Sequence, residues 1–325
     1  MKKLNKLPLA LTILGLGAAS SFAAIPIGDS LSVSGFLDMS ANGMAPDTGD
    51  ATLNAAVDQF EIDFMLKFGY FSARADINSI GPTGAVSFEQ GFVTAALTEG
   101  LTVSVGKFLS SSGFEAAEPT GLYQYSVSKL MSGCATGAPN CVYGGYQNGL
   151  NVAYAAPKFA LYGSVVTSVW GTDVDLKTPG FEAQLALMPV EGLTAKVTGL
   201  YEMYDDTTSH DSQSELNVWA QYVMGPLTVA AEYSMLMDWM VKGESGNGWL
   251  AMANYKLTDK IAATVRYSGI KMESADDPDT EVTFSPSFAV APNWLALAEV
   301  RYEIEGDTAP DIKGVSYAVE STFSF

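Results

Sequence analysis

Positive charge is scarce in this sequence. Its 325 residues include 17 lysines and arginines, 36 acidic residues and one histidine, which gives a formal net charge of −19. So acidic a chain lacks the basic surface that binds nucleic-acid phosphates, and no nucleic-acid partner is expected. Charged residues of both signs make up only 16% of the chain and hydrophobic residues 48%. This composition also excludes a disordered acidic chain.

Long apolar runs are scarce as well. After residue 24 the longest nearly apolar run, residues 159–170, is about a dozen residues, whereas a membrane-spanning helix needs about 20. The N-terminus combines three lysines in residues 1–6, a mostly apolar stretch over 7–17 and small residues at 21 and 23, which is typical of a cleaved export signal. We predict a signal peptide over residues 1–23 and one domain over residues 24–325. A membrane anchor is the disfavoured alternative, because the apolar stretch is short and contains Pro8.

The remaining chain alternates between apolar and polar residues. In residues 57–68, every second residue from Phe60 to Phe68 is apolar, and the residues between them include Glu61, Asp63 and Lys67. A period of two is that of a β-strand with one apolar and one polar face. About sixteen segments of about 9 to 13 residues share this pattern. They begin near residues 31, 57, 71, 86, 101, 150, 159, 181, 193, 215, 227, 248, 261, 282, 293 and 314.

Strands of this kind occur in soluble β-sandwiches and in membrane barrels whose apolar face contacts lipid. Segment length favours the barrel, because sandwich strands average about five or six residues and a tilted bilayer-spanning strand needs about 9 to 11. The predicted fold class is therefore all-β: a transmembrane antiparallel up-and-down β-barrel of about 16 strands. A secreted soluble sandwich stays open as an alternative.

The connections between these segments alternate in length. Short ones lie at 69–70, 98–100, 156–158, 189–192, 225–226, 258–259 and 291–292. Longer ones lie between them at 40–56, 79–85, 109–147, 171–180, 205–214, 238–247, 273–280 and 306–313. Outer-membrane barrels have short periplasmic turns and longer external loops in this order. The alternation therefore supports the barrel and predicts that both termini lie on the periplasmic side.

The C-terminal segment ends on an aromatic residue in phase with its apolar face. Val315, Tyr317, Val319, Phe323 and Phe325 share that face. A terminal aromatic residue on an amphipathic strand is similar to the signal that the outer-membrane insertion machinery reads. We therefore expect that machinery to be a partner of the chain through Phe325.

Four segments carry a further pattern: residues 33–38 (VSGFLD), 59–63 (QFEID), 88–93 (FEQGFV) and 101–108 (LTVSVGKF). On these segments, residues 33 to about 108 resemble the OmpL-like β-barrel porin family of Gram-negative outer membranes. The resemblance implies an outer-membrane location and diffusion of small solutes, and it says little about which solute. Beyond residue 170 only general barrel character is visible.

A barrel of 16 strands encloses an aqueous lumen, whereas a barrel of about eight strands is filled by side chains. Charged residues on the polar face would line that lumen, because a lysine or arginine that faces lipid near mid-membrane costs roughly 2–4 kcal/mol. Simple solvation is the alternative reading for any single one. The predicted pore-lining residues are Glu61, Asp63, Lys67, Arg74, Asp76, Glu89, Lys107, Lys196, Glu202, Glu232, Arg266, Glu299, Arg301 and Glu303.

The longest connection, residues 109–147, follows the fifth predicted strand and is the third external loop. In general porins this loop folds into the lumen and narrows it. We predict such a constriction here, with a loop that caps the barrel mouth as the alternative. Its candidate residues are Glu115, Glu118, Tyr123, Tyr125 and Lys129.

This loop also holds the only two cysteines, Cys134 and Cys141. In an exported chain, so close a pair predicts a local disulfide. A metal site would need further ligands of the expected kind nearby, and a structural zinc site usually has four. No metal and no cofactor are therefore expected.

The predicted function is an outer-membrane porin, a passive diffusion channel for small hydrophilic solutes or ions, and not an enzyme. Acidic residues in the external loops, such as Asp276 and Asp277, predict a preference for cations. Outer-membrane lipid is an expected partner, and a homotrimer stays open. One alternative is a non-conducting structural or adhesive barrel. An outer-membrane hydrolase is disfavoured, because catalysis needs a nucleophile and a base in fixed geometry and the only histidine, His210, lies in a polar loop.

Overall fold

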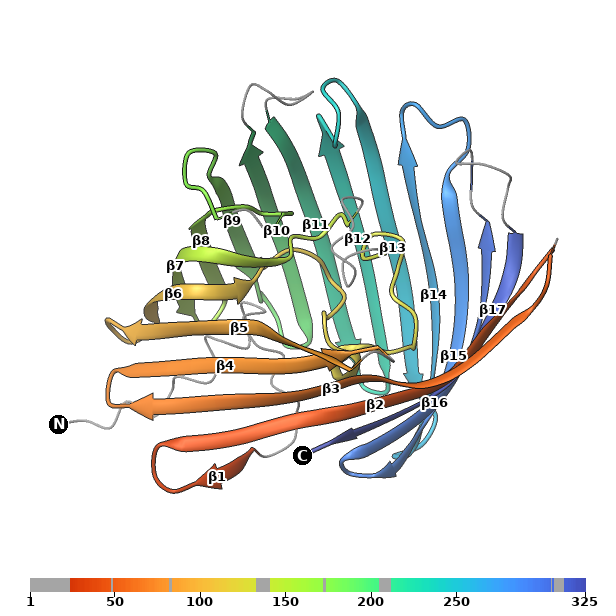
Figure 1. Ribbon diagram of the computed structural model, residues 1–325, viewed down its shortest axis with the longest axis horizontal. Coiled ribbons are helices and arrows are strands. Elements are labelled where there is room, and N and C mark those ends of the chain that lie inside the picture. The colour runs from red at the N-terminus through yellow and green to blue at the C-terminus, as the bar shows by residue number, and fades with distance from the viewer. Residues whose placement is uncertain are drawn as a thin grey trace.

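A computed structural model describes residues 24–47, 49–81, 84–132, 141–171, 174–204, 212–304, 306 and 313–325. In this part of the chain, sixteen antiparallel strands, β2 to β17, close into an up-and-down barrel, and a three-residue strand, β1, precedes them (Figure 1). The predicted fold class is confirmed. The strands are β1 (Ile25–Ile27), β2 (Leu31–Pro46), β3 (Thr52–Phe68), β4 (Phe71–Ile80), β5 (Ala85–Ala96), β6 (Leu101–Leu109), β7 (Tyr146–Ala156), β8 (Phe159–Val166), β9 (Gly180–Leu187), β10 (Leu193–Met203), β11 (Ser212–Met224), β12 (Leu227–Met237), β13 (Ser245–Lys256), β14 (Ile261–Met272), β15 (Asp279–Ala291), β16 (Trp294–Ile304) and β17 (Lys313–Ser324).

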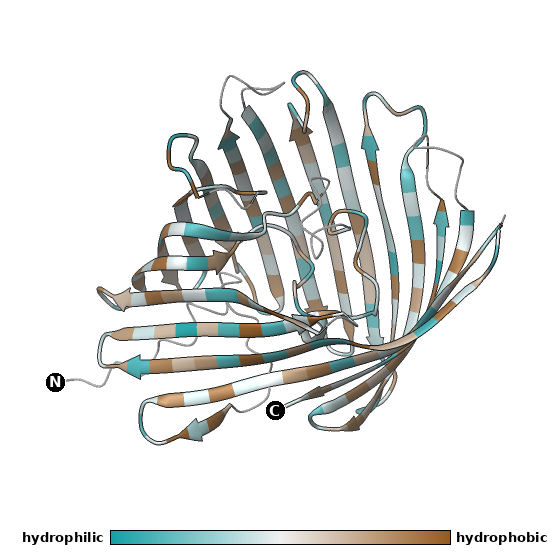
Figure 2. Cartoon of the chain, in the orientation of Figure 1, coloured by the Kyte–Doolittle hydropathy of each residue, from teal (hydrophilic) through white to brown (hydrophobic). Residues whose placement is uncertain are grey.

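The two faces of each strand differ in exposure as the alternation predicts. Along β9, buried and exposed residues alternate at every position. On β14, Arg266 is 0% exposed while its neighbour Val265 is 50% exposed. Figure 2 shows the same alternation as hydrophilic and hydrophobic bands along the strands. The barrel therefore has an apolar outer face and a polar inner face, which is the reverse of a soluble protein.

Strands that leave a short turn begin where the sequence predicts. β2, β4, β6, β8, β10, β12 and β14 all start at the expected residue, and β16 starts one residue later than expected, at Trp294. Strands that enter from a long loop start one to five residues earlier than predicted, because pairing continues past the bilayer-length segment; β3, for example, begins at Thr52. Within the described ranges, no α-helix is both long and apolar enough to cross a bilayer.

The barrel closes where β17 pairs with β2. This pairing runs from Gly314 opposite Pro46 to Ser324 opposite Phe36. Beyond it, the backbones of Phe325 and Gly35 exchange two hydrogen bonds of 2.9 Å. β1 then pairs with residues 31–33 of β2, past the end of β17. The short N-terminal strand thus continues the ladder where the C-terminal strand stops, and β2 has no open edge there.

Two glycines of β2 make room for aromatic rings of β17 at this closure. A Cβ atom on Gly35 would lie 2.7 Å from the ring of Phe325, and one on Gly43 would lie 2.9 Å from the ring of Tyr317. Each added Cβ would also lie 2.2 Å from a backbone oxygen of β3. Only glycine fits at these two positions, so the ring of the terminal Phe325 packs directly against the backbone of β2 at Gly35.

Replacing Gly35 by valine should destabilise the closed barrel by at least about 1–3 kcal/mol, because the added atoms displace both the Phe325 ring and the β3 backbone. The measurement is the midpoint of urea unfolding in detergent, followed by heat-modifiable gel mobility. Gly199→Val is the matched control, since a Cβ on Gly199 meets no atom within 4 Å. Equal midpoints for the two variants would contradict the argument.

Candidate functional site

The inner face of the barrel carries the charged residues that the alternation singles out. Because the outer face is exposed, a buried charged strand residue points inward. Glu61, Asp63, Asp76, Glu89, Lys196, Glu202, Glu232, Arg266, Glu299 and Glu303 are buried. Arg74 and Arg301 lie on the same face and are partly buried, and Lys67 follows Asp63 in phase but is exposed at the strand end.

Lys107 is out of phase with the buried residues of its strand. It occupies the same alternate positions of β6 as Val105, which is 56% exposed, while Phe108 beside it is 0% exposed and faces inward. Its Nζ donates a hydrogen bond of 3.0 Å to the backbone oxygen of Phe88. The same Nζ lies 5.8 Å from the centre of the Tyr146 ring, whose hydroxyl donates a hydrogen bond to Glu118 in the loop after β6, so the ammonium group of Lys107 lies close to lumen residues although its backbone is in phase with the outer face. Lys107 lies two residues before the end of β6, where a long side chain reaches polar surroundings without facing the lipid core.

Five further inward carboxylates escaped the sequence prediction. All are less than 5% exposed and alternate in phase with polar neighbours: Asp38, Glu182, Glu215, Glu281 and Glu320. The same period of two would have found them. They were missed because they lie near strand ends or in segments with few other charges. The described lumen therefore has a larger excess of acidic over basic side chains than the prediction implied, although Glu281 itself pairs with Arg266 and Arg301.

The segment between β6 and β7, residues 110–145, is called loop L3 here; its residues 110–132 and 141–145 are described, and they include one turn of 3-10 helix, η1 (Pro119–Gly121). In Figure 1 this yellow segment lies inside the ring of strands. The loop contacts inward side chains from opposite walls of the barrel. The described part of L3 therefore lies inside the lumen.

Arg266 of β14 holds the middle of L3. It is 0% exposed, and its Nη1 donates to Glu115 Oε1 at 2.6 Å and to the Ser126 backbone oxygen at 2.7 Å. Its Nη2 donates to Glu281 Oε1 of β15 at 2.7 Å. One guanidinium thus joins the loop to two wall strands. A buried charge with several charge-assisted hydrogen bonds of this kind costs much to leave unpaired.

The other predicted loop residues also contact the wall. The Tyr125 hydroxyl accepts hydrogen bonds from Ser40 at 3.1 Å and from Asn42 at 3.0 Å. Lys129 Nζ lies 3.5 Å from Glu303. The backbone oxygen of Tyr123 accepts a hydrogen bond from Thr264 at 3.0 Å. Together with Glu115 on Arg266, these contacts tie L3 to β2, β14 and β16.

Wall carboxylates also accept hydrogen bonds from backbone amides of the loop. The amide of Phe114 donates to Glu232 Oε1 and that of Ser126 donates to Glu299 Oε2, both at 3.0 Å. The Tyr143 hydroxyl donates to Glu232 as well. Burial and the charge of Glu232 raise the pKa of Tyr143 well above its usual value, so this phenol stays protonated as a donor. Inward carboxylates therefore act as acceptors for the loop.

Beneath the loop lies an apolar cluster that is unusual for a polar lumen. Three residues of L3 pack against residues on or next to two wall strands. The loop residues are Leu130, Met131 and Val142, and the wall residues are Leu236 of β12, Trp239 just after it, and Leu250 and Met252 of β13. Contacts within the cluster exclude water from one side of the barrel interior. Burial of this apolar surface adds to the hydrogen bonds that hold L3 in place.

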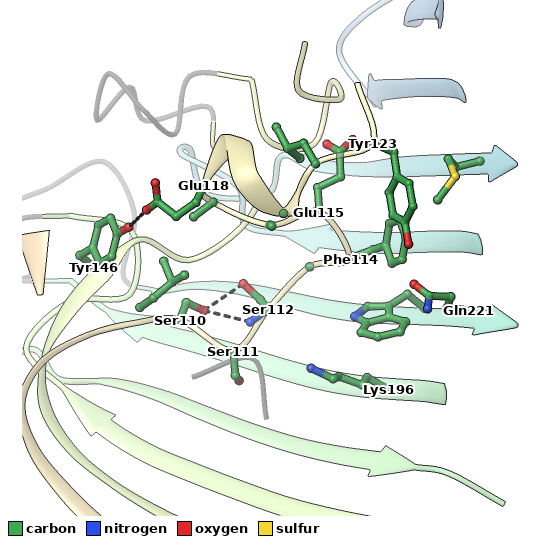
Figure 3. Close-up of a pocket in the computed structure, with 18 of the residues that line it drawn as sticks. Ser110, Ser111, Ser112, Phe114, Glu115, Glu118, Tyr123, Tyr146, Lys196 and Gln221 are labelled. Carbon is green, nitrogen blue, oxygen red and sulfur yellow. Dashed lines mark hydrogen bonds between the residues drawn. The ribbon is translucent and has the colours of Figure 1, made fainter. Parts of the chain in front are cut away.

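A cavity of about 520 Å³ remains between L3 and the wall (Figure 3). On one side Lys196 Nζ lies 5.1 Å from the centre of the Trp219 ring, and Phe114 packs edge-on against that ring. On the other side lie Glu118 and Tyr146, joined by a hydrogen bond of 2.9 Å. The cavity thus has a basic, aromatic wall and an acidic wall.

Glu118, which lines the cavity, belongs to a cluster of carboxylates from β3, β4, β5 and L3 that lies beside it, called the acidic wall here. Arg74 donates from Nε to Asp76 at 2.8 Å and lies 3.5 Å from Asp63, so these two acids are compensated. Gln59 Nε2 donates to Glu61 at 3.1 Å and to Glu118 at 2.9 Å. Burial first, and then the charge of Glu89, raises the pKa of Glu118 to about 8.

Cys141 is buried at the end of L3, and Cys134 lies outside the described residues, so the disulfide stays a prediction. His210 likewise lies outside the described residues.

A closed antiparallel barrel with sixteen long strands, an apolar outside, a charged inside and a loop in the lumen defines a porin-like outer-membrane protein. The chain belongs to the family described as "Putative beta-barrel porin-2, OmpL-like", whose model matches residues 26–323. No curated protein sequence matches the chain.

Solved outer-membrane proteins share the fold at low sequence identity. The channel DcaP of Acinetobacter baumannii has a TM-score of 0.68 and 16% identity over 94% of this chain and 100% of its own. The anion-selective porin from Comamonas acidovorans has a TM-score of 0.71 and 10% identity, with coverage of 91% and 99%. The trimer form of OmpT from Vibrio cholerae has a TM-score of 0.64 and 13% identity, with coverage of 91% and 100%.

The raised pKa of Glu118 predicts that the protein loses stability as the pH rises. Between its ordinary pKa near 4.5 and its folded value of about 8, the folded state binds more proton than the unfolded state. Its contribution is therefore most favourable below about pH 4.5 and is lost as the pH rises toward about 8. Thermal unfolding in detergent with EDTA, at pH 5 and pH 8.5, measures this loss.

Glu118→Gln isolates the effect from other carboxylates. The variant should gain stability relative to the unmodified protein at pH 8.5 and gain less, or none, at pH 5. A stability difference that does not change between the two pH values would show that Glu118 does not titrate in this range.

Proposed function

We propose that the protein is a passive diffusion channel of the outer membrane, with a water-filled lumen that L3 narrows. The observation that carries this proposal is the combination of a sixteen-strand closure with a charged inner face. A barrel of this size is wide enough for an aqueous path, and charges placed along the path select solutes by width and field. On this reading the chain is not an enzyme.

Cation preference is the proposed selectivity. Described inward carboxylates outnumber inward lysines and arginines, and the acids missed by the sequence prediction widen the excess. Negative potential in a narrow, low-dielectric passage concentrates cations and repels anions. The fold is shared with an anion-selective porin, so the argument rests on the charges of this chain.

The proposal extends to how the chain reaches the membrane. Residues 1–23 would direct export and be removed, and Phe325 would be read by the barrel insertion machinery. Cys134 and Cys141 would close a small disulfide loop at the end of L3. A homotrimer is proposed in line with the trimer form of the OmpT structure.

A second candidate function is a non-conducting structural or adhesive barrel. It is favoured by one observation, the apolar cluster of L3 and wall residues that fills part of the lumen. Conductance separates the two, because a plugged barrel carries no single-channel current.

Recording purified protein in planar bilayers tests the proposed function. We expect discrete conductance steps and, in a tenfold KCl gradient, a reversal potential of the cation-selective sign. Its magnitude should shrink as ionic strength rises, since salt screens the charges of the lumen. Absence of steps would favour the structural barrel, and a reversal potential of the opposite sign would refute cation preference.

Replacing Arg266 by methionine should release L3 from the wall. The change leaves Glu115 without its cation, leaves Glu281 with Arg301 alone, and removes six donated hydrogen bonds. We expect larger and noisier single-channel conductance and a loss of about 3–5 kcal/mol in unfolding free energy.

Arg301→Met is the matched control for this variant. Arg301 pairs with Glu281 and Glu303 on the wall, so its loss removes the same charge without breaking a hydrogen bond to the loop. Equal conductance changes in the two variants would mean that Arg266 acts through its charge alone and that L3 is not the constriction.

A further inference from the structure

Three carboxylates from separate segments converge beside the cavity. Glu61 lies on β3, Glu89 on β5 and Glu118 on L3, and one oxygen of each lies within 4.8 Å of the others. Glu61 is 1% exposed and Glu89 is 7% exposed, so bulk water screens them poorly. Three buried acids this close repel one another strongly unless protons or a cation neutralise them.

The basic side chains near these three acids have other partners: Lys107 Nζ donates to the Phe88 backbone oxygen and lies 5.8 Å from the centre of the Tyr146 ring. Within the described ranges, no basic side chain forms an ion pair with Glu61, Glu89 or Glu118. The nearby Arg74 is engaged by Asp63 and Asp76 instead. Asp63 and Asp76 thus share the counter-charge of Arg74, and Glu61, Glu89 and Glu118 have no ion-pair partner among the described residues.

One carboxylate oxygen of Glu89 has no binding partner in the described part of the chain. Its Oε1 accepts a hydrogen bond of 2.5 Å from Asn78 Nδ2, which fixes the carboxylate. Its Oε2 is buried and has no hydrogen-bond partner. A buried unpaired carboxylate oxygen is costly, and here it belongs to a side chain that converges with two other acids.

The spacing suits a hard divalent cation. Ca²⁺ takes six to eight oxygen ligands at about 2.3–2.6 Å in flexible geometry, so ligand oxygens around one ion lie up to about twice that distance apart. The observed limit of 4.8 Å meets this condition. Mg²⁺ demands shorter distances and near-octahedral geometry, which three carboxylates from three separate segments meet less easily.

We propose that Glu61, Glu89 and Glu118 bind one Ca²⁺ ion that joins L3 to the barrel wall, with water completing its shell. The ion would neutralise the buried charge, give Glu89 Oε2 its partner and tie Glu118 of L3 to β3 and β5, strands that the contacts of Arg266 do not include. The site does not depend on whether the lumen conducts.

The test uses the full-length mature protein folded in detergent, freed of metal with EDTA and then of EDTA. Isothermal titration with CaCl₂ measures affinity, and Tb³⁺ luminescence gives a second readout, because the Tyr146 hydroxyl lies 2.9 Å from Glu118 and can sensitise a bound lanthanide. We expect one site that Ca²⁺ occupies at lower concentration than Mg²⁺.

Glu89→Gln and Glu118→Gln should each weaken Ca²⁺ binding at least tenfold, because affinity follows the number of charged ligands. Glu215→Gln is the matched control. Glu215 is a lumen carboxylate of similar burial whose Oε1 accepts a hydrogen bond from Ser234, and it is not one of the three proposed ligands. It should bind Ca²⁺ as the unmodified protein does. Heat-modifiable gel mobility checks that each variant is folded.

Two results would overturn the site. If the unmodified protein shows no saturable Ca²⁺ binding, shared protons neutralise the three carboxylates. If all three variants bind Ca²⁺ equally, the ion binds elsewhere. A barrel that conducts but binds no Ca²⁺ refutes the metal site alone. A barrel that binds Ca²⁺ through Glu89 and Glu118 but carries no current refutes the channel alone.

Discussion

The constraint on which this structure depends is that hydrocarbon offers no hydrogen-bond partner to a backbone. Every strand therefore needs a neighbour on both sides, and the chain meets this need by closing β17 on β2. The closure explains the details at that edge: glycines at 35 and 43 that admit aromatic rings, a C-terminal backbone bonded to Gly35, and a three-residue β1 that extends the ladder. These features do not build an apolar core. They allow the strands at the closure to keep hydrogen-bonded neighbours on both sides.

Closure also decides where charge can lie. With lipid outside, side chains that carry charge are confined to the lumen, where water is limited and L3 takes up space. Their energies then depend on partners. Arg266 is stable at 0% exposure because Glu115, Glu281 and backbone oxygens of L3 surround it. The same residues that would tune a channel therefore also hold the loop in place, so selectivity and loop position cannot be varied independently.

The sequence predicts the strands better than the site, and the reason is the range of the signal. Period-two alternation is local, so β4, β6 and β8 begin at the expected residues, whereas β1, with three residues, is too short to alternate. The lumen is built by contacts such as Arg266 with Glu115, 151 residues apart, which no local pattern encodes. Lys107 shows why phase alone does not place a long side chain. Its backbone is in phase with Val105 of the outer face, yet its ammonium group reaches the Tyr146 ring, because a lysine near a strand end can extend toward polar surroundings.

The acidic wall shows how little of a lumen's electrostatics follows from net charge. The chain has an excess of acid, yet Asp63 and Asp76 are compensated by Arg74 while Glu61, Glu89 and Glu118, a few ångströms away, are not. Protons and a divalent cation are the two ways to neutralise that second group, and they differ in consequence. Protonation would leave L3 attached by its hydrogen bonds, its ion pairs with Arg266 and Glu303 and its apolar cluster, and this part of the loop would respond to pH. A bound ion would make a segment of L3 part of the wall and would reduce the negative potential of the cavity, so the ion content of the surroundings would set both the width and the selectivity of the passage.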